Sequence, residues 1–119
     1  MTMKKPNPWD RITVVLVTRN SESILPLSLG SLKKAQRIIL IDAMSTDNTI
    51  AVAQSIHPAL EVISLIKDKG LGAGTNKGFS LAKTEYVLNI NPDTKFTEGC
   101  IEQLVLTADE NINAAGIAP

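Results

Sequence analysis

The stretch ITVVLV, residues Ile12–Val17, is an unbroken run of apolar and β-branched side chains. A strand with one face in water alternates apolar and polar residues, whereas an unbroken run of this length is typical of a strand buried on both faces of a sheet. A second run of this kind, RIILI, follows at Arg37–Ile41. The two runs therefore indicate a sheet that is covered on both sides.

Helical patterns alternate with these strands. Leu25, Leu29 and Leu32 share one face of a helix predicted over 23–34, and cap residues at 45–47 predict a second helix that ends near Pro58. The other expected elements are strands at 61–66 and 85–90, a helix that follows the glycine-rich stretch 70–74 and runs through Lys83, a helix from Thr97 or Glu98, and a fifth strand at 114–119. This alternation predicts an α/β fold with a doubly wound, mostly parallel sheet and helices on both faces.

Composition narrows the class of protein. The chain has 119 residues, which suits one domain, and we divide it into an N-terminal extension, 1–11, and a domain, 12–119. Twelve basic residues balance twelve acidic ones and no basic run exceeds two residues, so no nucleic-acid partner is expected. No apolar stretch approaches the roughly 18 residues of a membrane span. The polar first ten residues and the single cysteine, Cys100, favour a cytoplasmic protein.

Ligands of doubly wound sheets bind beyond the carboxyl ends of the strands, so the residues that follow each strand are the candidate site. Thr18 and Asn20 follow the first strand, where an ordinary polar turn is the simpler interpretation. Asp42 ends the second strand, and a buried carboxylate is costly unless it is hydrogen-bonded or faces a ligand. Asp42 either accepts from a nucleobase N–H or a ribose hydroxyl, or caps its own loop.

The third and fourth strands are followed by a glycine-rich segment and a short turn. Gly70, Gly72, Gly74 and Gly78 permit close backbone approach to a ligand, and the helix after them could present N–H groups to a phosphate. Their spacing matches neither the dinucleotide fingerprint nor the P-loop. Asp93 lies in the turn NPDT, which is either an ordinary turn or a ligand for a hard cation such as Mg²⁺ or Mn²⁺.

Taken together and in order, these segments resemble the family 2 glycosyltransferases of the GT-A fold. The resemblance rests on four motifs: ITVVLVTRNSESILPLSLGSL from Ile12, IILIDAMSTDNT from Ile38, KGLGAGTNKG from Lys69 and YVLNINPDT from Tyr86. The NPDT turn is closest to rhamnosyltransferase-like members. The matching part of such proteins is the N-terminal half, a Rossmann-like unit that binds a nucleotide sugar.

The resemblance implies a role for each motif residue. Asp42 would bind the base, and Asp93 would hold Mg²⁺ or Mn²⁺ against the diphosphate. The other residues implied to bind the nucleotide sugar are Thr18, Asn20, Gly70, Gly72, Asn76, Gly78 and Asn91. Two departures stand out: Arg19 precedes Asn20 where an aromatic residue is common, and Asn91 takes the first acidic position of the Asp-x-Asp element.

The expected function is metal-assisted, inverting transfer of a sugar from a UDP- or dTDP-linked donor to a saccharide or glycoconjugate acceptor, as in polysaccharide biosynthesis. An inverting transfer needs a general base, and no residue of this chain matches the family's base, which belongs to a second half expected beyond Pro119. The catalytic residues are therefore unknown, and the alternative is a truncated, non-catalytic remnant that binds nucleotide. An exposed apolar face is expected where a partner half or a second copy would pack.

Overall fold

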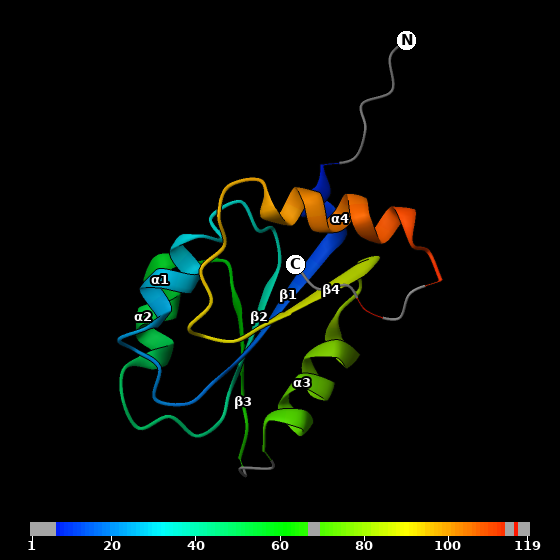
Figure 1. The fold of residues 1–119 in the computed structure, drawn as a ribbon. Helices are drawn as coiled ribbons and strands as arrows, with labels where there is room; N and C mark the ends of the chain where they lie inside the picture. Colours follow the sequence, from blue (N-terminus) through cyan, green and yellow to red (C-terminus); the bar gives the residue numbers. More distant parts are fainter. Residues whose placement is uncertain (1–6, 67–69, 114–115, 117–119) are drawn as a thin grey trace.

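The computed structural model describes residues 7–66, 70–113 and 116, and of residues 70–72 it describes the backbone only. Its elements alternate as the sequence predicts (Figure 1). They are η1 Pro8–Arg11, β1 Ile12–Thr18, α1 Leu25–Gly30, β2 Ile38–Asp42, α2 Thr49–Ile56, β3 Glu61–Ser64, α3 Gly70–Leu81, β4 Tyr86–Ile90 and α4 Cys100–Glu110. The fifth strand expected at 114–119 lies outside the described residues except for Gly116.

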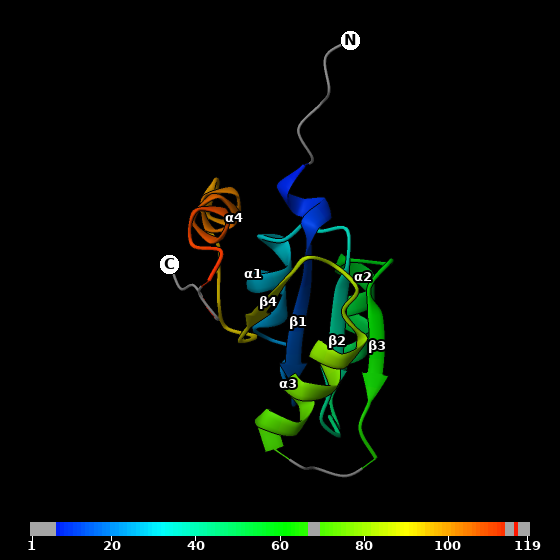
Figure 2. The same ribbon diagram turned by 90° about the vertical axis from the view of Figure 1, so that its right-hand side faces the viewer.

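The four strands form one parallel sheet in the order β3-β2-β1-β4. Thr18 at the end of β1 pairs with Asp42 at the end of β2, and Leu16 pairs with Ile90 at the end of β4. All carboxyl ends therefore meet at one edge, which is the lower edge in Figure 2. The α/β fold with a doubly wound parallel sheet is confirmed.

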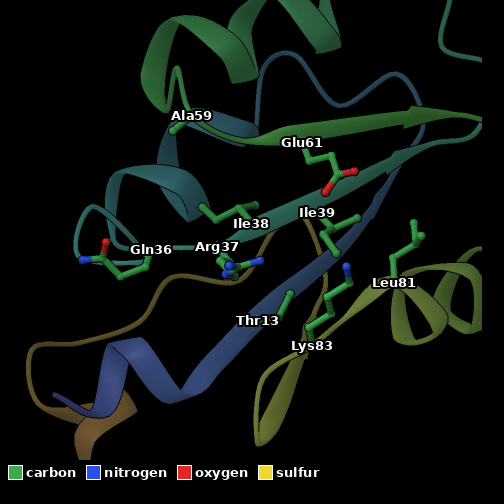
Figure 3. A pocket seen from close by; sticks show the side chains of 9 residues that line it. All are labelled: Thr13, Gln36, Arg37, Ile38, Ile39, Ala59, Glu61, Leu81 and Lys83. Carbon is green, nitrogen blue, oxygen red and sulfur yellow. The ribbon is translucent and has the colours of Figure 1, made fainter. Parts of the chain in front are cut away.

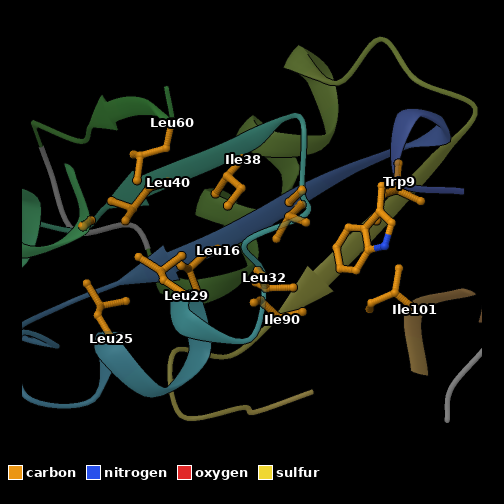
Figure 4. Packing of buried hydrophobic residues seen from close by; sticks show 14 of the residues in the cluster. Trp9, Leu16, Leu25, Leu29, Leu32, Ile38, Leu40, Leu60, Ile90 and Ile101 are labelled. Carbon is orange, nitrogen blue, oxygen red and sulfur yellow. The ribbon is translucent and has the colours of Figure 1, made fainter. Parts of the chain in front are cut away.

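Two apolar clusters hold the helices on the sheet. The larger one joins α1, α2 and α4 to one face, and Figure 4 shows its side chains. The smaller one, Val17, Ile39, Ile41 and Ala43, lies on the face that α3 covers. The larger cluster includes Trp9, from the segment that the sequence analysis sets apart as an extension, and its indole N–H donates to Glu102 Oε1 at 2.8 Å.

Helix α3 packs unusually close to the sheet. A Cβ atom built on Gly78 would lie 2.2 Å from Cγ1 of Val15, and one built on Gly74 would lie 3.1 Å from Cγ2 of Val17. Both distances are too short for ordinary side-chain contact, so these glycines allow the helix to approach β1. The sequence predicts that the glycine-rich stretch 70–74 precedes the helix, and this prediction is wrong, because α3 begins at Gly70 and includes the whole stretch.

The other helix ends also differ from the sequence prediction. α1 is shorter than 23–34 because the chain turns after Gly30, where the Ser31 hydroxyl bonds the carbonyl oxygen of Ser28 at 2.7 Å. α4 begins at Cys100 rather than at 97 or 98, since Gly99 before it has a left-handed φ of 84°. Within the described part of the chain, no helix is long and apolar enough to cross a membrane.

An ion-pair network lies at the edge of the sheet where the strands begin. Arg11 contacts Glu85 at 2.9 Å and Asp109 at 2.6 Å, and the Tyr86 hydroxyl donates to Asp109 at 2.7 Å. The Arg11 hydrogen bonds, followed by that of Tyr86, lower the pKa of Asp109 to about 2. This network connects the starts of β1 and β4 to the last turn of α4.

Candidate functional site

The carboxyl edge of the sheet brings together the loops that the sequence analysis singles out. Thr18 and Asp42 are register partners, and the turn that starts at Asn91 follows directly after Ile90, the partner of Leu16. The first turns of α3 lie at the same edge, where Gly74 packs over Val17 (Figure 2). The loops after β1, β2 and β4 therefore face one region together with the start of α3.

Asp42 is the buried carboxylate at the centre of this edge, with 3% of its surface exposed. Its Oδ1 accepts from the Thr18 hydroxyl at 3.0 Å and from the Ser45 hydroxyl at 2.6 Å, and its Oδ2 accepts from the Ser45 backbone N–H at 3.0 Å. These bonds offset the cost of burying the charge. Asp42 thus closes its own loop, as one of the two sequence interpretations predicts.

Asn20 ties the first loop to the second. Its Oδ1 accepts from the Thr46 backbone N–H at 2.8 Å, and its own N–H donates to the Ser45 hydroxyl at 2.8 Å. Asn20 and Met44 both adopt left-handed φ angles, 46° and 60°, which persist in non-glycine residues only where surrounding contacts fix them. Ser45 and Thr46 are therefore site residues that the sequence analysis treats only as helix caps; the one signal for Ser45 is its place three residues after Asp42.

Asp47 lies two residues before the start of α2 and is bonded to that helix rather than to the open part of the site. Its carboxylate accepts from the backbone N–H of Thr49 at 3.0 Å, from the Thr49 hydroxyl, and from the backbone N–H of Glu22 at 3.3 Å. The Thr49 hydroxyl is the main cause that lowers the pKa of Asp47. The sequence predicts the N-cap within 45–47, whereas the N-cap residue is Asn48, whose side chain makes no capping bond, and the Asp47 carboxylate accepts the first N–H of the helix instead.

Asn91 and Asp93 are exposed in the turn after β4, which the Thr94 N–H closes by donating to the Asn91 carbonyl at 3.1 Å. Among the described residues there is no group of three or more His, Cys, Asp or Glu that could hold a metal ion. One carboxylate beside one amide suits a hard cation only when water and phosphate oxygens complete its shell. The donor set therefore fits a metal ion that is shared with a bound diphosphate.

The glycines of α3 divide into two groups. Gly70 and Gly72 lie in the first turn of the helix, at the carboxyl edge, and Asn76 is exposed one turn later. Gly78 is buried against Val15 between helix and sheet. The structure therefore gives Gly78 a packing role in place of the position beside a ribose and diphosphate that the resemblance implies.

A hollow of about 420 Å³ lies at the opposite, amino-terminal edge of the strands (Figure 3). Thr13, Arg37 and Glu61 line it from the first residues of the strands or just before them, and Lys83 lines it from beyond the end of α3. None of the candidate binding residues predicted from the sequence lines this hollow. It is therefore separate from the candidate site.

Comparison with known proteins assigns the sequence family. Residues 13–118 match the family described as Glycosyl transferase family 2. An uncharacterized glycosyltransferase of Mycobacterium tuberculosis is 33% identical over 101 residues, which cover 85% of this chain and 45% of that protein. The protein TagX of Staphylococcus aureus is 30% identical over 113 residues, covering 87% of this chain and 32% of TagX. The chain thus spans less than half the length of these relatives.

Solved structures share the fold at lower identity. TarS of Staphylococcus aureus in complex with UDP superposes with a TM-score of 0.77 at 22% identity, over 92% of this chain and 38% of TarS. The mannosyltransferase PcManGT of Pyrobaculum calidifontis, in complex with GDP-Man and Mn²⁺, has a TM-score of 0.66 at 22% identity, over 72% of this chain and 28% of its own. These likenesses support the GT-A form of the sheet, and the sequence match decides the family. The chain belongs to the family 2 glycosyltransferases.

Proposed function

We propose that this chain binds a nucleoside-diphosphate sugar, together with Mg²⁺ or Mn²⁺, as the donor-binding part of an inverting glycosyltransferase that acts on a saccharide or glycoconjugate acceptor. The observation that carries the proposal is the buried carboxylate of Asp42, which three hydrogen bonds hold at the carboxyl edge of the sheet. This edge is where doubly wound sheets bind ligands. Membership of the glycosyltransferase family supports the proposal.

In this proposal the base of the nucleotide lies against Asp42, with Thr18 and Asn20 beside it. The backbone N–H groups of Gly70 and Gly72 lie in the first turn of α3, where a helix favours negative charge, so the diphosphate would face this turn. Asn76, one turn further along, would lie next to the ribose and diphosphate. Gly78 packs against Val15, and we leave it out of the proposed binding residues.

Asp93 would hold the metal ion, with Asn91 beside it and the remaining ligands drawn from water and the diphosphate. A bound divalent ion would offset the negative charge that grows on the leaving nucleoside diphosphate. PcManGT was solved with Mn²⁺, and a glucosyl-3-phosphoglycerate synthase of Mycobacterium tuberculosis with Mg²⁺ and UDP, which supports a divalent ion here. We assign no catalytic base, since none of the motif residues matches the family's base.

Thermal unfolding of the 119-residue chain with UDP, dTDP and GDP, each with and without Mn²⁺, tests the proposal. A nucleotide at about 100 times its dissociation constant should stabilise the fold by about 2.7 kcal/mol, which corresponds to several degrees in Tm. Asp42→Asn is the control variant, because it preserves the shape of the side chain and removes its charge. If no nucleotide raises the Tm of the wild-type chain, the proposal is wrong.

A further inference from the structure

We propose that the hollow at the amino-terminal edge of the strands is a second ligand site, which binds a small phosphorylated amine. Its phosphate group would lie between Arg37 and Lys83, and its ammonium group would lie at Glu61. The volume of the hollow, about 420 Å³, lies within the range of roughly 300–1,000 Å³ that is usual for small-molecule sites. The hollow and the proposed nucleotide site lie at opposite ends of the strands, so this inference does not rest on the proposed function.

The hollow exists because α3 ends before it reaches the amino-terminal edge. On the face of the sheet that α3 covers, alternate residues of each strand form a row of apolar side chains. The last residue of the helix is Leu81. Beyond it the rows of β1, β2 and β3 continue with Thr13, Arg37 and Glu61. The uncovered end of the sheet therefore presents polar and charged side chains in place of apolar ones.

The three charged side chains of the hollow do not pair with one another. In Figure 3 the carboxylate of Glu61 and the amino group of Lys83 point toward each other from opposite sides of Ile39, and the guanidinium of Arg37 lies beside them. Within the described part of the chain, no ion pair or side-chain hydrogen bond joins these three charged residues to any other residue. Their charges are therefore available to a ligand.

The charges indicate the chemistry of this ligand. Arg37 and Lys83 supply two positive charges, and a phosphate group on a small molecule carries about −1.5 to −2 charges at pH 7. The guanidinium can bind two phosphate oxygens at once, and the lysine adds a point charge. Glu61 supplies one carboxylate, which only accepts hydrogen bonds and so suits an ammonium group. A phosphate at one end and an ammonium at the other therefore match all three side chains.

The strand register indicates the size of the ligand. Glu61 pairs with Ile39, so it lies one strand across and two residues along from Arg37. Ile39 is 4% exposed and lies between the charged groups, so the part of the ligand that joins its two ends would rest on an apolar side chain. A short carbon linker between phosphate and ammonium fits this arrangement.

NMR titration of the isotope-labelled 119-residue chain with O-phosphoethanolamine tests the site. Saturable shifts are expected for the backbone amide signals of Thr13, Ile39 and Lys83. Ethyl phosphate is the matched ligand, because it keeps the phosphate and lacks the ammonium group. It should bind about threefold more weakly, which is the effect expected of one ion pair near the surface.

Two variants assign the two ends of the ligand. Glu61→Gln keeps the shape of the side chain and removes its charge, so it should bring the dissociation constants of the two ligands together. Arg37→Gln should weaken both ligands by at least about threefold. Lys33→Gln is the control, since it removes the same charge from an exposed side chain outside the hollow and should leave both dissociation constants unchanged.

Three results would overturn the inference. The first is the absence of saturable shifts at the hollow with O-phosphoethanolamine. The second is a dissociation constant that both Arg37→Gln and Lys83→Gln leave unchanged. The third is equal binding of the two ligands to the wild-type chain, which would leave Glu61 without a ligand group. None of these results involves a nucleotide or Asp42, so the proposed function is tested separately.

Discussion

Replacing Gly78 by alanine tests the close packing of α3 on the sheet. The added methyl group would lie 2.2 Å from Cγ1, 3.1 Å from Cγ2 and 3.3 Å from Cβ of Val15. Val15 cannot easily move away, because its side chain is fully buried and stiff at χ1 and its backbone lies in an interior strand of the sheet. The helix must therefore move away from the sheet.

Two opposing effects determine how much Gly78→Ala changes the free energy of unfolding. Alanine is a better helix former than glycine by about 1 kcal/mol, which favours the variant. Overpacking a well-packed core costs about 1–3 kcal/mol or more, and a contact of 2.2 Å with a stiff side chain belongs at the upper end of that range. The net expectation is a loss of about 2 kcal/mol, or roughly 10 °C in Tm for a domain of this size.

Urea and thermal unfolding followed by circular dichroism measure this loss. Gly30→Ala is the matched control, since Gly30 ends α1 and a Cβ atom there meets nothing within 4 Å, so its Tm should stay the same or rise. In a Val15→Ala background, Gly78→Ala should cost much less, because the γ carbons that it meets are gone. A Gly78→Ala chain that melts at or above the wild-type Tm would refute the close packing of α3.

Three further outcomes are expected. Asp109→Asn should make the free energy of unfolding depend less on pH in acid. The folded-state pKa of Asp109 is about 2, below its ordinary value of 3.8. The pairing of Asp109 with Arg11 therefore stabilises the fold fully above pH 3.8, and this contribution is lost as the pH falls through 2. Trp9→Phe should lower the free energy of unfolding by at least about 1 kcal/mol, as measured in urea, because the bond to the partly exposed Glu102 is lost and the smaller ring fills less of the buried site. Asp93→Asn should abolish the gain in UDP affinity that Mn²⁺ provides, measured by calorimetry.

Each of these has its own control. The control for Asp109→Asn is Asp10→Asn, which removes an exposed carboxyl from the turn before Arg11 and should leave the decrease of Tm at acid pH as in the wild type. If the Tm of Asp109→Asn decreases with pH as it does in the wild type, the role of the ion pair is contradicted. Trp9→Phe should cost less in a Glu102→Leu background, and an equal cost there would assign the loss to packing. Glu98→Gln, an exposed acid further along the loop of Asp93, should keep the Mn²⁺ response. An undiminished Mn²⁺ response in Asp93→Asn would leave that residue without a metal role.

The sequence predicts the strands more closely than the helices, for a physical reason. Ile12–Val17 is fully buried, and burial on both faces leaves a continuous apolar run that is visible in the sequence. The apolar spacing of Leu25, Leu29 and Leu32 also predicts their burial correctly, although α1 ends before Leu32. The start of α3 is missed because glycine disfavours helix in isolation, whereas here close contact with Val17 of the sheet favours glycine at position 74.

The order of the predicted strands indicates that the loops of the site lie at one edge of the sheet, but it does not predict the hydrogen bonds between these loops. That Thr18 and Asp42 lie side by side follows from parallel pairing of two recognisable strands. The link from Asn20 through Ser45 to Asp42 depends on two left-handed backbone angles, at Asn20 and Met44, which no local pattern indicates. The same link makes Asp42→Ala a poor probe of binding, because it would leave the donors of Thr18 and Ser45 unpaired and weaken the fold as well.

The strand order also bears on how the chain folds. Val14 in β1 pairs with Ile38, 24 residues later, but its partner on the other side is Leu88, 74 residues later. Closing the longer loop costs roughly 1 kcal/mol more in chain entropy, so β4 is expected to join after β1, β2 and β3 have paired. Until it does, one edge of an almost wholly apolar strand is open to pairing with another chain. During synthesis this interval lasts at least until Ile90 has left the ribosome, and the contacts of Arg11 with Glu85 and Asp109 then hold the late strand and the helix after it in place.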